Sequence, residues 1–508
     1  MLSKVFTGAV MGINGLIMEV EVDIARGLPV FSTVGLPEAA VRESRERVRS
    51  AVVNCGYEFP DDRITVNLAP ANIKKEGTGF DLPIAVGILS ASGVVPEGAP
   101  DRYLLLGELA LDGRIKQVSG CLPVAVAAKE AGFSGVLVPF ENRREAAVVE
   151  GLDVFAVSGL SQAVDFLRGQ CEVAAQPHET FYDPQAETGI ETDFSEVAGQ
   201  AHVKRALEIA AAGAHNVIMT GPPGSGKTML ARRFAGIVPP MSFEEALETT
   251  KIFSVAGLLQ KDQALVTGRP FRAPHHTVSD AGLVGGGNIP RPGEVSLSHN
   301  GVLFLDELPE FKKSVLEVLR QPMEERRVTI SRASVSLSYP ADFTLIAASN
   351  PCPCGYYSDP VHECRCSPAQ IARYRNRLSG PLLDRIDIHV EVPAVAYRDL
   401  VSVKPAESSA DIRRRVMAAR RIQESRFGRS RIKTNAAMKN RHIKKHCSLD
   451  RESSGILEKA AAGLGLSARA CHRILKIART IADLQGQAVI RAPHILEAVG
   501  YRSMDRTL

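Results

Sequence analysis

The residues with the clearest chemical potential form one glycine-rich loop near the middle of the chain. This loop, which we call the phosphate loop, consists of Gly221, Pro222, Pro223, Gly224, Ser225, Gly226, Lys227 and Thr228. It matches the pattern G-x-x-x-x-G-K-[ST] at each fixed position. The glycines allow backbone N–H groups to surround phosphate oxygens, Lys227 can reach the β- and γ-phosphates, and the Thr228 hydroxyl can hold Mg²⁺. These residues predict a site for ATP or GTP with Mg²⁺.

A second segment supplies two adjacent carboxylates. The apolar residues 302–305 predict a buried parallel strand, and Asp306 and Glu307 follow at its carboxyl end, where open α/β sheets bind their ligands. We expect Asp306 to hold Mg²⁺ through water and Glu307 to polarise the attacking water. Either acid alone is also typical of an ordinary surface charge, but the pair after a buried strand favours the catalytic interpretation.

Four cysteines form a third candidate site, in two C-x-C pairs separated by nine residues: Cys352, Cys354, Cys364 and Cys366. Four thiolates suit a tetrahedral structural Zn²⁺, although this spacing is tighter than usual and His362 could replace one sulfur. Free thiols or a redox-labile disulfide are the alternatives. The chain has nine cysteines and no secretory signal pattern at its start, which favours a reducing, cytoplasmic location and metal over disulfides.

The elements that must position these residues follow from periodicity and composition. The apolar run 216–220 before the phosphate loop predicts a strand and residues 229–234 after it predict a helix, whose N-terminus adds partial positive charge. The 508 residues are 45% hydrophobic and 23% charged, which indicates a globular protein of about three domains. The net charge of +4 identifies no partner, and no apolar run reaches about 18 residues, so no membrane span is expected.

The order of elements predicts four parts. Residues 1–170 interleave short strands with helices, as in an α/β or α+β domain. Residues 171–190 are polar and aperiodic, which is typical of a linker. Residues 191–395 predict the nucleotide-binding core, and residues 396–508 predict an all-α region.

The central part resembles AAA+ ATPases. Residues 193–200 resemble the segment that helps to form their adenine pocket, and Asn350, at the end of the next predicted strand, fits their first sensor. An asparagine at a strand end is ordinarily a turn residue, but its order after the phosphate loop and the acid pair favours the sensor. Residues 379–389 resemble the segment with the arginine finger in magnesium-chelatase and MCM-type members, which implies a finger at Arg385 that acts on a neighbouring subunit in a ring. The alternative is a structural ion pair of Arg385 with Asp384 or Asp387.

The C-terminal part resembles AAA+ lids. Residues 466–479 resemble the second sensor helix, which implies that Arg469, or else Arg473, lies near the γ-phosphate. The helical pattern over 411–426 is strongly basic, as is the segment that follows it: Arg413, Arg414, Arg415, Arg420, Arg421, Arg426, Arg429, Arg431, Lys433, Lys439, Arg441, Lys444 and Lys445. This charge is typical of nucleic-acid binding. A solvated helix face that contacts a neighbouring subunit is nearly as plausible for any single residue.

Two insertions resemble those of helicase-like AAA+ proteins. Residues 281–294, rich in glycine and proline, predict a hairpin tip, and residues 327–337 predict a second hairpin. In that clade the corresponding hairpins face a central pore and grip DNA. The resemblance implies that Arg291 and Arg332 contact phosphates without selecting sequence, although exposed arginines in loops are common.

The N-terminal part resembles the proteolytic domain of Lon proteases in residues 107–115 and 136–142. The family's nucleophilic serine and activating lysine fall on Gly79 and Val124, neither of which can do that chemistry. Thr78 with Lys74 or Lys75 is a weak substitute pair. The resemblance therefore implies a Lon-like domain without peptidase activity, kept for assembly or partner contact.

Taken together, the chain resembles the ComM/YifB family of magnesium-chelatase-like AAA+ ATPases over nearly its whole length. The resemblance implies a multidomain α/β fold: a Lon-protease-like α+β domain, a P-loop AAA+ parallel-sheet core and an all-α C-terminal lid. It also implies a homo-hexameric, ATP-driven helicase that acts on single-stranded or branched DNA in recombination during natural transformation. A magnesium-chelatase motor subunit is disfavoured because the chain lacks a D-x-S-x-S motif and an acidic, proline-rich linker. An ATP-dependent protease is disfavoured by Gly79 and Val124.

Overall fold

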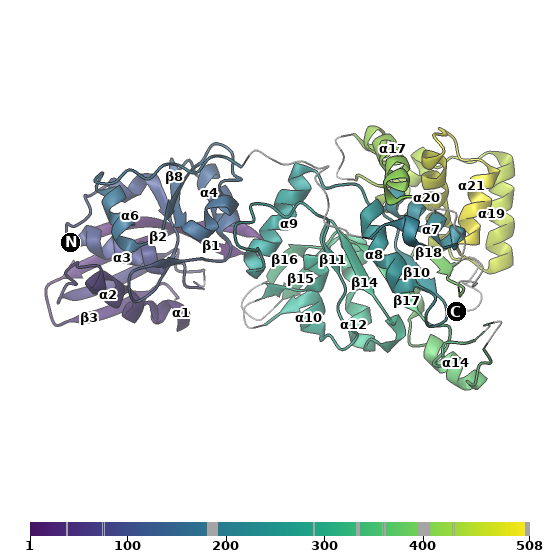
Figure 1. Ribbon diagram of the computed structural model, residues 1–508, viewed down its shortest axis with the longest axis horizontal. Coiled ribbons are helices and arrows are strands. Elements are labelled where there is room, and N and C mark those ends of the chain that lie inside the picture. The colour runs from purple at the N-terminus through teal and green to yellow at the C-terminus, as the bar shows by residue number, and fades with distance from the viewer. Residues whose placement is uncertain are drawn as a thin grey trace. The chain divides into compact units, whose positions relative to one another are not determined.

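The computed structural model describes residues 1–36, 39–73, 75, 77–179, 192–287, 290–331, 336–357, 359, 362–394, 407–428, 430 and 432–502, with only the backbone of 39 and 40. The chain forms two compact units (Figure 1). The first unit contains Met1–Asp183 and Ser242–Thr267, and the second contains Pro184–Met241 and Gly268–Leu508. Residues 242–267 therefore belong to the first unit, although they lie within the predicted nucleotide-binding core in sequence.

The first unit is built on a seven-stranded sheet with strand order β3-β4-β2-β1-β5-β8-β9. Its strands are β1 (Leu2–Met11), β2 (Asn14–Ala25), β3 (Val30–Val34), β4 (Arg63–Ala69), β5 (Tyr103–Leu105), β8 (Gly135–Pro139) and β9 (Asp153–Val157). The β1–β2 and β2–β4 pairs are antiparallel and the other neighbours are parallel. Along β2, Met18, Val20 and Val22 are buried while the residues between them are partly exposed, as alternation in the sequence predicts.

Helices and short elements complete the first unit. They are α1 (Ala39–Arg42), α2 (Ser44–Asn54), α3 (Asp81–Ala91), β6 (Glu108–Leu109), β7 (Ile115–Lys116), α4 (Cys121–Glu130), α5 (Arg143–Ala146), α6 (Leu160–Leu167) and α9 (Phe243–Ala256). Strands and helices are interleaved along this unit, as the sequence of residues 1–170 predicts. Ten of the eleven residues of α3 are buried, so this helix passes through the core and does not lie on its surface.

A buried carboxylate accepts hydrogen bonds from both α4 and α9 and so holds the two helices together. Glu145, 4% exposed, accepts hydrogen bonds from the Leu122 amide at 2.9 Å, from Asn142 Nδ2 at 2.9 Å and from the Ser254 hydroxyl of α9. Burial raises the pKa of Glu145, against the opposing effect of these three donors. The Gly120 amide also donates to the Ser254 carbonyl at 3.1 Å. These contacts explain why α9 belongs to the first unit.

The second unit contains a five-stranded, fully parallel sheet. Its strand order is β11-β14-β17-β10-β18, formed by β11 (Phe271–Arg272), β14 (Val302–Leu305), β17 (Thr344–Ser349), β10 (Val217–Thr220) and β18 (Ile388–Glu391). Every residue of β14 and β17 is buried, as expected for a parallel sheet covered on both faces. Because all strands point the same way, the segments that follow them meet at one edge.

Helices surround this sheet and form the C-terminal region. They are α7 (Ala201–Gly213), α8 (Lys227–Ile237), α10 (Asp280–Val284), α11 (Glu294–Leu297), α12 (Lys313–Val318), α13 (Arg320–Glu325), α14 (Pro368–Arg375), α15 (Gly380–Leu383), α17 (Ser409–Phe427), α18 (Asn440–His446), α19 (Arg451–Leu464), α20 (Ala468–Leu484) and α21 (Ala492–Gly500). One apolar core joins Val217 and Ile388 of the sheet to Ile474 and Ile481 of α20. The described residues from 407 onward contain helices and no strand. None of the helices among the described residues is long and apolar enough to cross a lipid bilayer.

Candidate nucleotide site

The phosphate loop connects β10 to α8 and has the backbone that phosphate binding requires. Gly224 and Gly226 have φ values of 76° and 87°, a region that favours glycine, and α8 begins at Lys227. A Cβ at Gly221 would lie 2.1 Å from the Val392 carbonyl oxygen, so only glycine allows this close approach. The strand, loop and helix predicted from the sequence are confirmed.

Lys227 and Asn350 come together at this edge of the sheet. The Lys227 ammonium donates to the carbonyl oxygens of Gly221 at 2.7 Å and Pro222 at 2.9 Å, and to Asn350 Oδ1 at 3.2 Å. Burial lowers the pKa of Lys227, while Asp306 and Glu307 act in the opposite direction. Asn350 directly follows β17, the strand beside β10, so the predicted sensor position lies where an amide can contact a γ-phosphate.

The acid pair also lies at this edge. The Thr228 hydroxyl donates to Asp306 Oδ2 at 2.7 Å, which joins the two predicted Mg²⁺ ligands. Glu307 has a φ of 52°, and its amide donates to Asp306 Oδ1 at 2.9 Å. A non-glycine residue in this left-handed region is uncommon and is found preferentially at functional sites. Hydroxyl and carboxylate oxygens are the ligands that Mg²⁺ prefers.

His276 is a site residue that the sequence reasoning missed. Its Nδ1 lies 3.6 Å from Glu307 Oε2, and its ring lies 4.0 Å from that of His275, centroid to centroid. Both histidines follow β11, so the parallel sheet carries them to the same edge as the phosphate loop. A His-His pair two residues beyond the end of a short strand is the only signal in the sequence, and it specifies no partner.

Arg385 lies at the opposite edge of the sheet from the phosphate loop. It precedes β18, and its carbonyl accepts from the side chain of Asn216, which precedes β10. A four-residue strand spans about 13 Å, so Arg385 is remote from Lys227 of the same chain. The guanidinium pairs with Glu324 Oε1 at 2.7 Å and donates to the Pro381 carbonyl at 2.6 Å. Its Nε is buried and has no hydrogen-bond partner among the described residues.

The ion pair considered for Arg385 is formed by other residues. Asp387 pairs with Arg473 of α20, and it accepts from His215 Nδ1 at 3.2 Å and from the Asn216 amide at 3.3 Å. Arg473 and His215 hold the pKa of Asp387 well below its usual range, against the opposing effect of burial. Arg385 is therefore paired with a carboxylate, but with Glu324 and not with Asp384 or Asp387.

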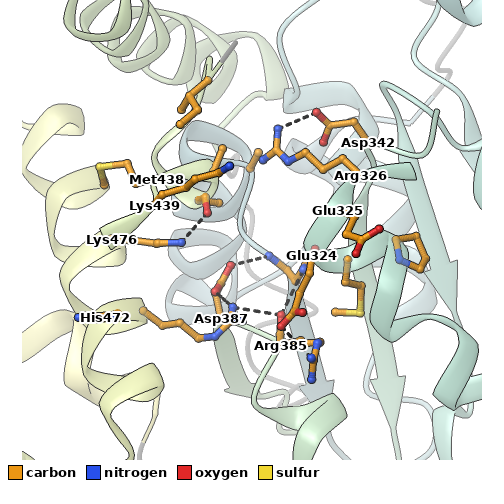
Figure 2. A pocket seen from close by; sticks show the side chains of 18 of the residues that line it. Glu324, Glu325, Arg326, Asp342, Arg385, Asp387, Met438, Lys439, His472 and Lys476 are labelled. Atoms are coloured by element: carbon orange, nitrogen blue, oxygen red, sulfur yellow. Dashed lines mark hydrogen bonds and ion pairs between the residues drawn. The ribbon is translucent and has the colours of Figure 1, made fainter. Parts of the chain in front are cut away.

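A basic cavity of about 1020 Å³ opens at this second edge (Figure 2). Eight arginine or lysine side chains line it against four carboxylates: Arg326, Arg327, Arg385, Lys439, Arg441, Arg469, Arg473 and Lys476, with Glu324, Glu325, Asp342 and Asp387. Burial lowers the pKa of Lys476 to about 8, although Asp387 opposes the shift. Arg469 and Arg473 thus line the same cavity as Arg385. The structure does not bring either of them to the phosphate loop of the same chain.

Both predicted hairpins are confirmed, and they contact each other. Strands β12 (Gly285–Gly286) and β13 (Arg291–Pro292) pair antiparallel, as do β15 (Arg327–Ser331) and β16 (Ser336–Pro340). The Tyr339 hydroxyl of the second hairpin donates to the Pro290 carbonyl of the first at 2.6 Å. Arg291 is exposed, and Arg332 lies outside the described residues.

Much of the basic charge of α17 is used inside the second unit. Arg413 donates to the Gly236 carbonyl at 2.8 Å, Arg420 donates to the Ala211 carbonyl at 2.8 Å, Arg415 pairs with Glu208 and Glu407, and Arg426 pairs with Asp483. Arg414 and Arg421 remain exposed on α17, and Arg441, Lys444 and Lys445 are exposed in α18. Arg429 and Arg431 lie outside the described residues. The helix α17 is therefore primarily a packing element and not the extended basic surface that its composition suggested.

The four cysteines of the insert converge. All four Sγ atoms lie within 4.8 Å of one another, and Cys352 Sγ lies 3.3 Å from Cys354 Sγ and 3.7 Å from Cys364 Sγ. Four sulfurs around Zn²⁺ at a Zn–S distance of about 2.3 Å lie about 3.8 Å apart. These separations fit a tetrahedral metal site, and they exceed the S–S length of a disulfide, about 2.05 Å.

The Lon-like catalytic positions carry no reactive pair. Val124, 2% exposed, packs against Gly8, where a Cβ would lie 2.2 Å from the Val124 Cγ1. The Thr78 hydroxyl donates to Glu108, and the buried Lys75 ammonium donates to the Pro70 carbonyl. The weak substitute pair is therefore not formed by Thr78 and Lys75. Lys74 lies outside the described residues.

The parallel sheet, with the phosphate loop, the acid pair and Asn350 at one edge, is the core of a P-loop ATPase, and the comparisons place it in the magnesium-chelatase-like AAA+ class. Three family models match it: "Magnesium chelatase, subunit ChlI" over residues 193–400, "Subunit ChlI of Mg-chelatase" over 20–142 and "Magnesium chelatase, subunit ChlI C-terminal" over 406–502.

Individual relatives give a finer placement. Competence protein ComM of Haemophilus influenzae is 46% identical and YifB of Escherichia coli K12 is also 46% identical, each over 100% of this chain and 98% of the relative. The magnesium-chelatase 38 kDa subunit of Rhodobacter capsulatus is 25% identical over 45% of this chain and 68% of that protein. The chain belongs to the ComM/YifB family of magnesium-chelatase-like ATPases, as its sequence resemblance indicated.

Proposed function

We propose that the protein is an ATP-driven ring motor, a homo-hexamer that moves DNA and acts in helicase or branch-migration steps during natural transformation. The single observation that supports assembly into a ring is the position of Arg385, which lies at the edge of the sheet opposite to the phosphate loop of its own chain. A guanidinium there cannot reach the phosphates bound by the same chain. It can complete the site of a neighbouring subunit that presents its phosphate loop to the basic cavity.

The residues at the carboxyl edge then have distinct roles in hydrolysis. Lys227 and the amides of the phosphate loop bind the phosphates, and Thr228 and Asp306 would hold Mg²⁺, which would neutralise charge on the phosphates. Glu307 polarises the attacking water and Asn350 orients it. Arg385 of the neighbour stabilises charge on the transferring phosphoryl group once the phosphate replaces Glu324, and its buried Nε, which lacks a partner in the described chain, provides an unused donor.

The assignment of DNA as the substrate rests on two kinds of support. The two hairpins contact each other and leave Arg291 exposed, and helicase-like members of this class use such hairpins to grip a strand. The 46% identical Haemophilus influenzae relative is a competence protein. Four arginines of α17 are used in contacts inside the second unit, so we assign the main DNA contacts to the hairpins.

A resident Zn²⁺ completes the proposal. Cys352, Cys354, Cys364 and Cys366 would hold it, and the separations of their sulfurs fit that ligand set. It has a structural role, because four thiolates leave no open coordination position for a substrate.

The test is ATP turnover by the purified protein with and without single-stranded DNA, together with unwinding of a three-way DNA junction. We expect DNA to stimulate turnover and the junction to be resolved only with ATP. Turnover indifferent to every DNA, with DNA affinity no better than that of a neutral control protein, would reject the motor.

A variant pair localises the DNA contact. Arg291→Ala should weaken binding uniformly across DNA sequences and reduce the slope of log affinity against log salt by about 1. Arg168→Ala removes an exposed arginine of the first unit and serves as the matched control. Equal effects of the two substitutions would exclude the hairpin as the site of contact.

A further inference from the structure

The four-cysteine insert lies directly against the phosphate loop. Gly355 follows the first cysteine pair, and a Cβ at this residue would lie 2.5 Å from Cδ and 2.7 Å from Cγ of Pro223. Gly355 is buried and has a φ of 85°. The turn made by Cys352, Pro353 and Cys354 therefore presses the Gly355 backbone onto the ring of Pro223, with no room for any side chain between them.

The same insert is continuous with the predicted sensor. Asn350, whose Oδ1 accepts from Lys227 at 3.2 Å, is two residues before Cys352. Lys227 in turn donates to the carbonyl of Pro222, the residue before Pro223. The insert is therefore linked to the nucleotide site in two ways: it continues the chain from Asn350, and Gly355 packs against the Pro223 ring.

The insert has little apolar core of its own. Among its described residues from 351 to 366, only Cys352 and Gly355 are buried. Further support comes from Arg375, whose Nε donates to the Pro351 carbonyl at 3.3 Å and whose guanidinium lies 4.9 Å from the centre of the Tyr357 ring. A segment that buries so little depends on metal coordination for a fixed conformation.

We propose that the four-cysteine cluster is a regulatory support of the phosphate loop, so that its occupancy by Zn²⁺ sets the affinity of the protein for ATP. With the cluster closed around the metal, Gly355 holds Pro223 and Asn350 in the arrangement that binds phosphate. Loss of the metal frees the turn made by Cys352, Pro353 and Cys354 and removes the contact from one side of the loop. This inference rests on the nucleotide site of the proposed function, but not on DNA as the substrate.

Thermodynamic linkage makes the proposal reciprocal. If Zn²⁺ increases the affinity for nucleotide, nucleotide must increase the affinity for Zn²⁺ by the same factor. Coupling between sites in proteins is typically about 5- to 150-fold, and direct contact between the turn and the loop leads us to expect at least about tenfold here. Two independent measurements must therefore agree.

The experiment uses the full chain, purified without added metal and analysed for zinc by mass spectrometry. We expect about one Zn²⁺ per chain. The dissociation constant of a fluorescent ATP analogue is then measured in Mg²⁺ for the zinc-loaded protein, the protein stripped with a zinc-selective chelator, and the stripped protein with Zn²⁺ restored. We expect stripping to weaken binding about tenfold or more, Zn²⁺ to restore it, and bound nucleotide to tighten zinc by the same factor.

Variants separate the contact from folding. Gly355→Ala keeps all four thiols but inserts a methyl group against Pro223, so it should retain zinc and still weaken nucleotide binding. Lys227→Ala should lose nucleotide binding and retain zinc, and Cys171→Ser, which alters an exposed cysteine outside the cluster, should change neither.

Equal nucleotide affinity with and without zinc, wild-type affinity in Gly355→Ala, or protein that carries no zinc would each overturn the inference alone. Failure of the zinc-loaded wild type to bind the ATP analogue would instead refute the nucleotide site itself.

Discussion

The ion pair of Asp387 with Arg473 connects the sheet to the C-terminal helices, and its removal is a stringent test of the second unit. The Asp387 side chain is 5% exposed and that of Arg473 is 20% exposed. Asp387→Asn keeps the size of the side chain but removes the charge, which leaves the Arg473 guanidinium without its counter-ion. Because breaking a buried pair in this way costs about 3–5 kcal/mol and Arg473 is partly solvated, we expect about 3 kcal/mol.

This free energy corresponds to a measurable shift in melting temperature. For large domains about 1 kcal/mol lowers the melting temperature by roughly 2–4 °C, so Asp387→Asn should lower it by about 6–12 °C. The relevant calorimetric transition is the one that a non-hydrolysable ATP analogue shifts upward, because ligand binding stabilises only the unit that contains its site. Asp384→Asn, a partly exposed neighbour, is the matched control and should stay within about 0.5 kcal/mol of wild type.

The difference in the free energy of unfolding between wild type and Asp387→Asn depends on pH, because the pKa of Asp387 is depressed in the folded protein. The stabilising contribution is fully present above the pKa of an unfolded aspartate, about 3.9, and is lost as the pH falls through the lower pKa of the folded state. Wild type should therefore be more stable to unfolding than Asp387→Asn at pH 6–8, and this stability difference should shrink below about pH 4. The ion pair of Asp387 with Arg473 would be refuted if Asp387→Asn lost less than about 1 kcal/mol of stability at pH 7. It would also be refuted if the stability difference from wild type grew in acid.

Three further predictions concern the chemistry of each unit. Glu307→Gln should retain ATP binding while kcat falls by at least about 100-fold, because the carboxylate that polarises water is gone; unchanged single-turnover hydrolysis would exclude this role. His276→Ala should lower kcat by up to about 100-fold with little change in nucleotide affinity, because the imidazole orients Glu307. The same substitution at His202, whose ring hydrogen-bonds to the Glu391 backbone carbonyl, should have little effect on kcat. The double variant Gly79→Ser and Val124→Lys, which introduces both Lon-type residues, should cleave no peptide. Position 124 packs against the β1–β2 pair, so a lysine there overpacks the core and destabilises the unit by about 1–3 kcal/mol. Cleavage of a fluorogenic peptide by the double variant would contradict this.

Sequence alone predicted the residues at the carboxyl edge of the parallel sheet. The phosphate loop, Asp306 and Asn350 each follow an apolar strand, and a parallel sheet necessarily carries such residues to one edge. His276 follows the same rule, but β11 has only two residues and leaves no periodicity to recognise. His276 was therefore missed because the strand β11 could not be recognised in the sequence. The rule that residues after parallel strands meet at one edge holds for it as well.

Contacts between residues distant in sequence could not be predicted. The arginines of α17 gave a basic pattern, but their partners Glu208 and Asp483 lie on other helices and no local rule links them. The contact of Gly355 with Pro223 joins residues on two different loops in the same way. The attachment of α9 to the first unit depends on Glu145, more than a hundred residues earlier. Each of these contacts is a property of the tertiary fold.

The central claim is that each ATP site is completed by a neighbouring subunit, and mixing two inactive variants tests it most directly. Lys227→Ala cannot bind nucleotide but supplies Arg385, while Arg385→Ala binds nucleotide but cannot complete the neighbouring site. Each should be inactive alone. In an equimolar mixed ring about one quarter of the interfaces join an intact phosphate loop to an intact arginine, so the mixture should recover up to about a quarter of wild-type ATP turnover. No recovery in rings shown to contain both variants, or full turnover by Arg385→Ala alone, would contradict the account.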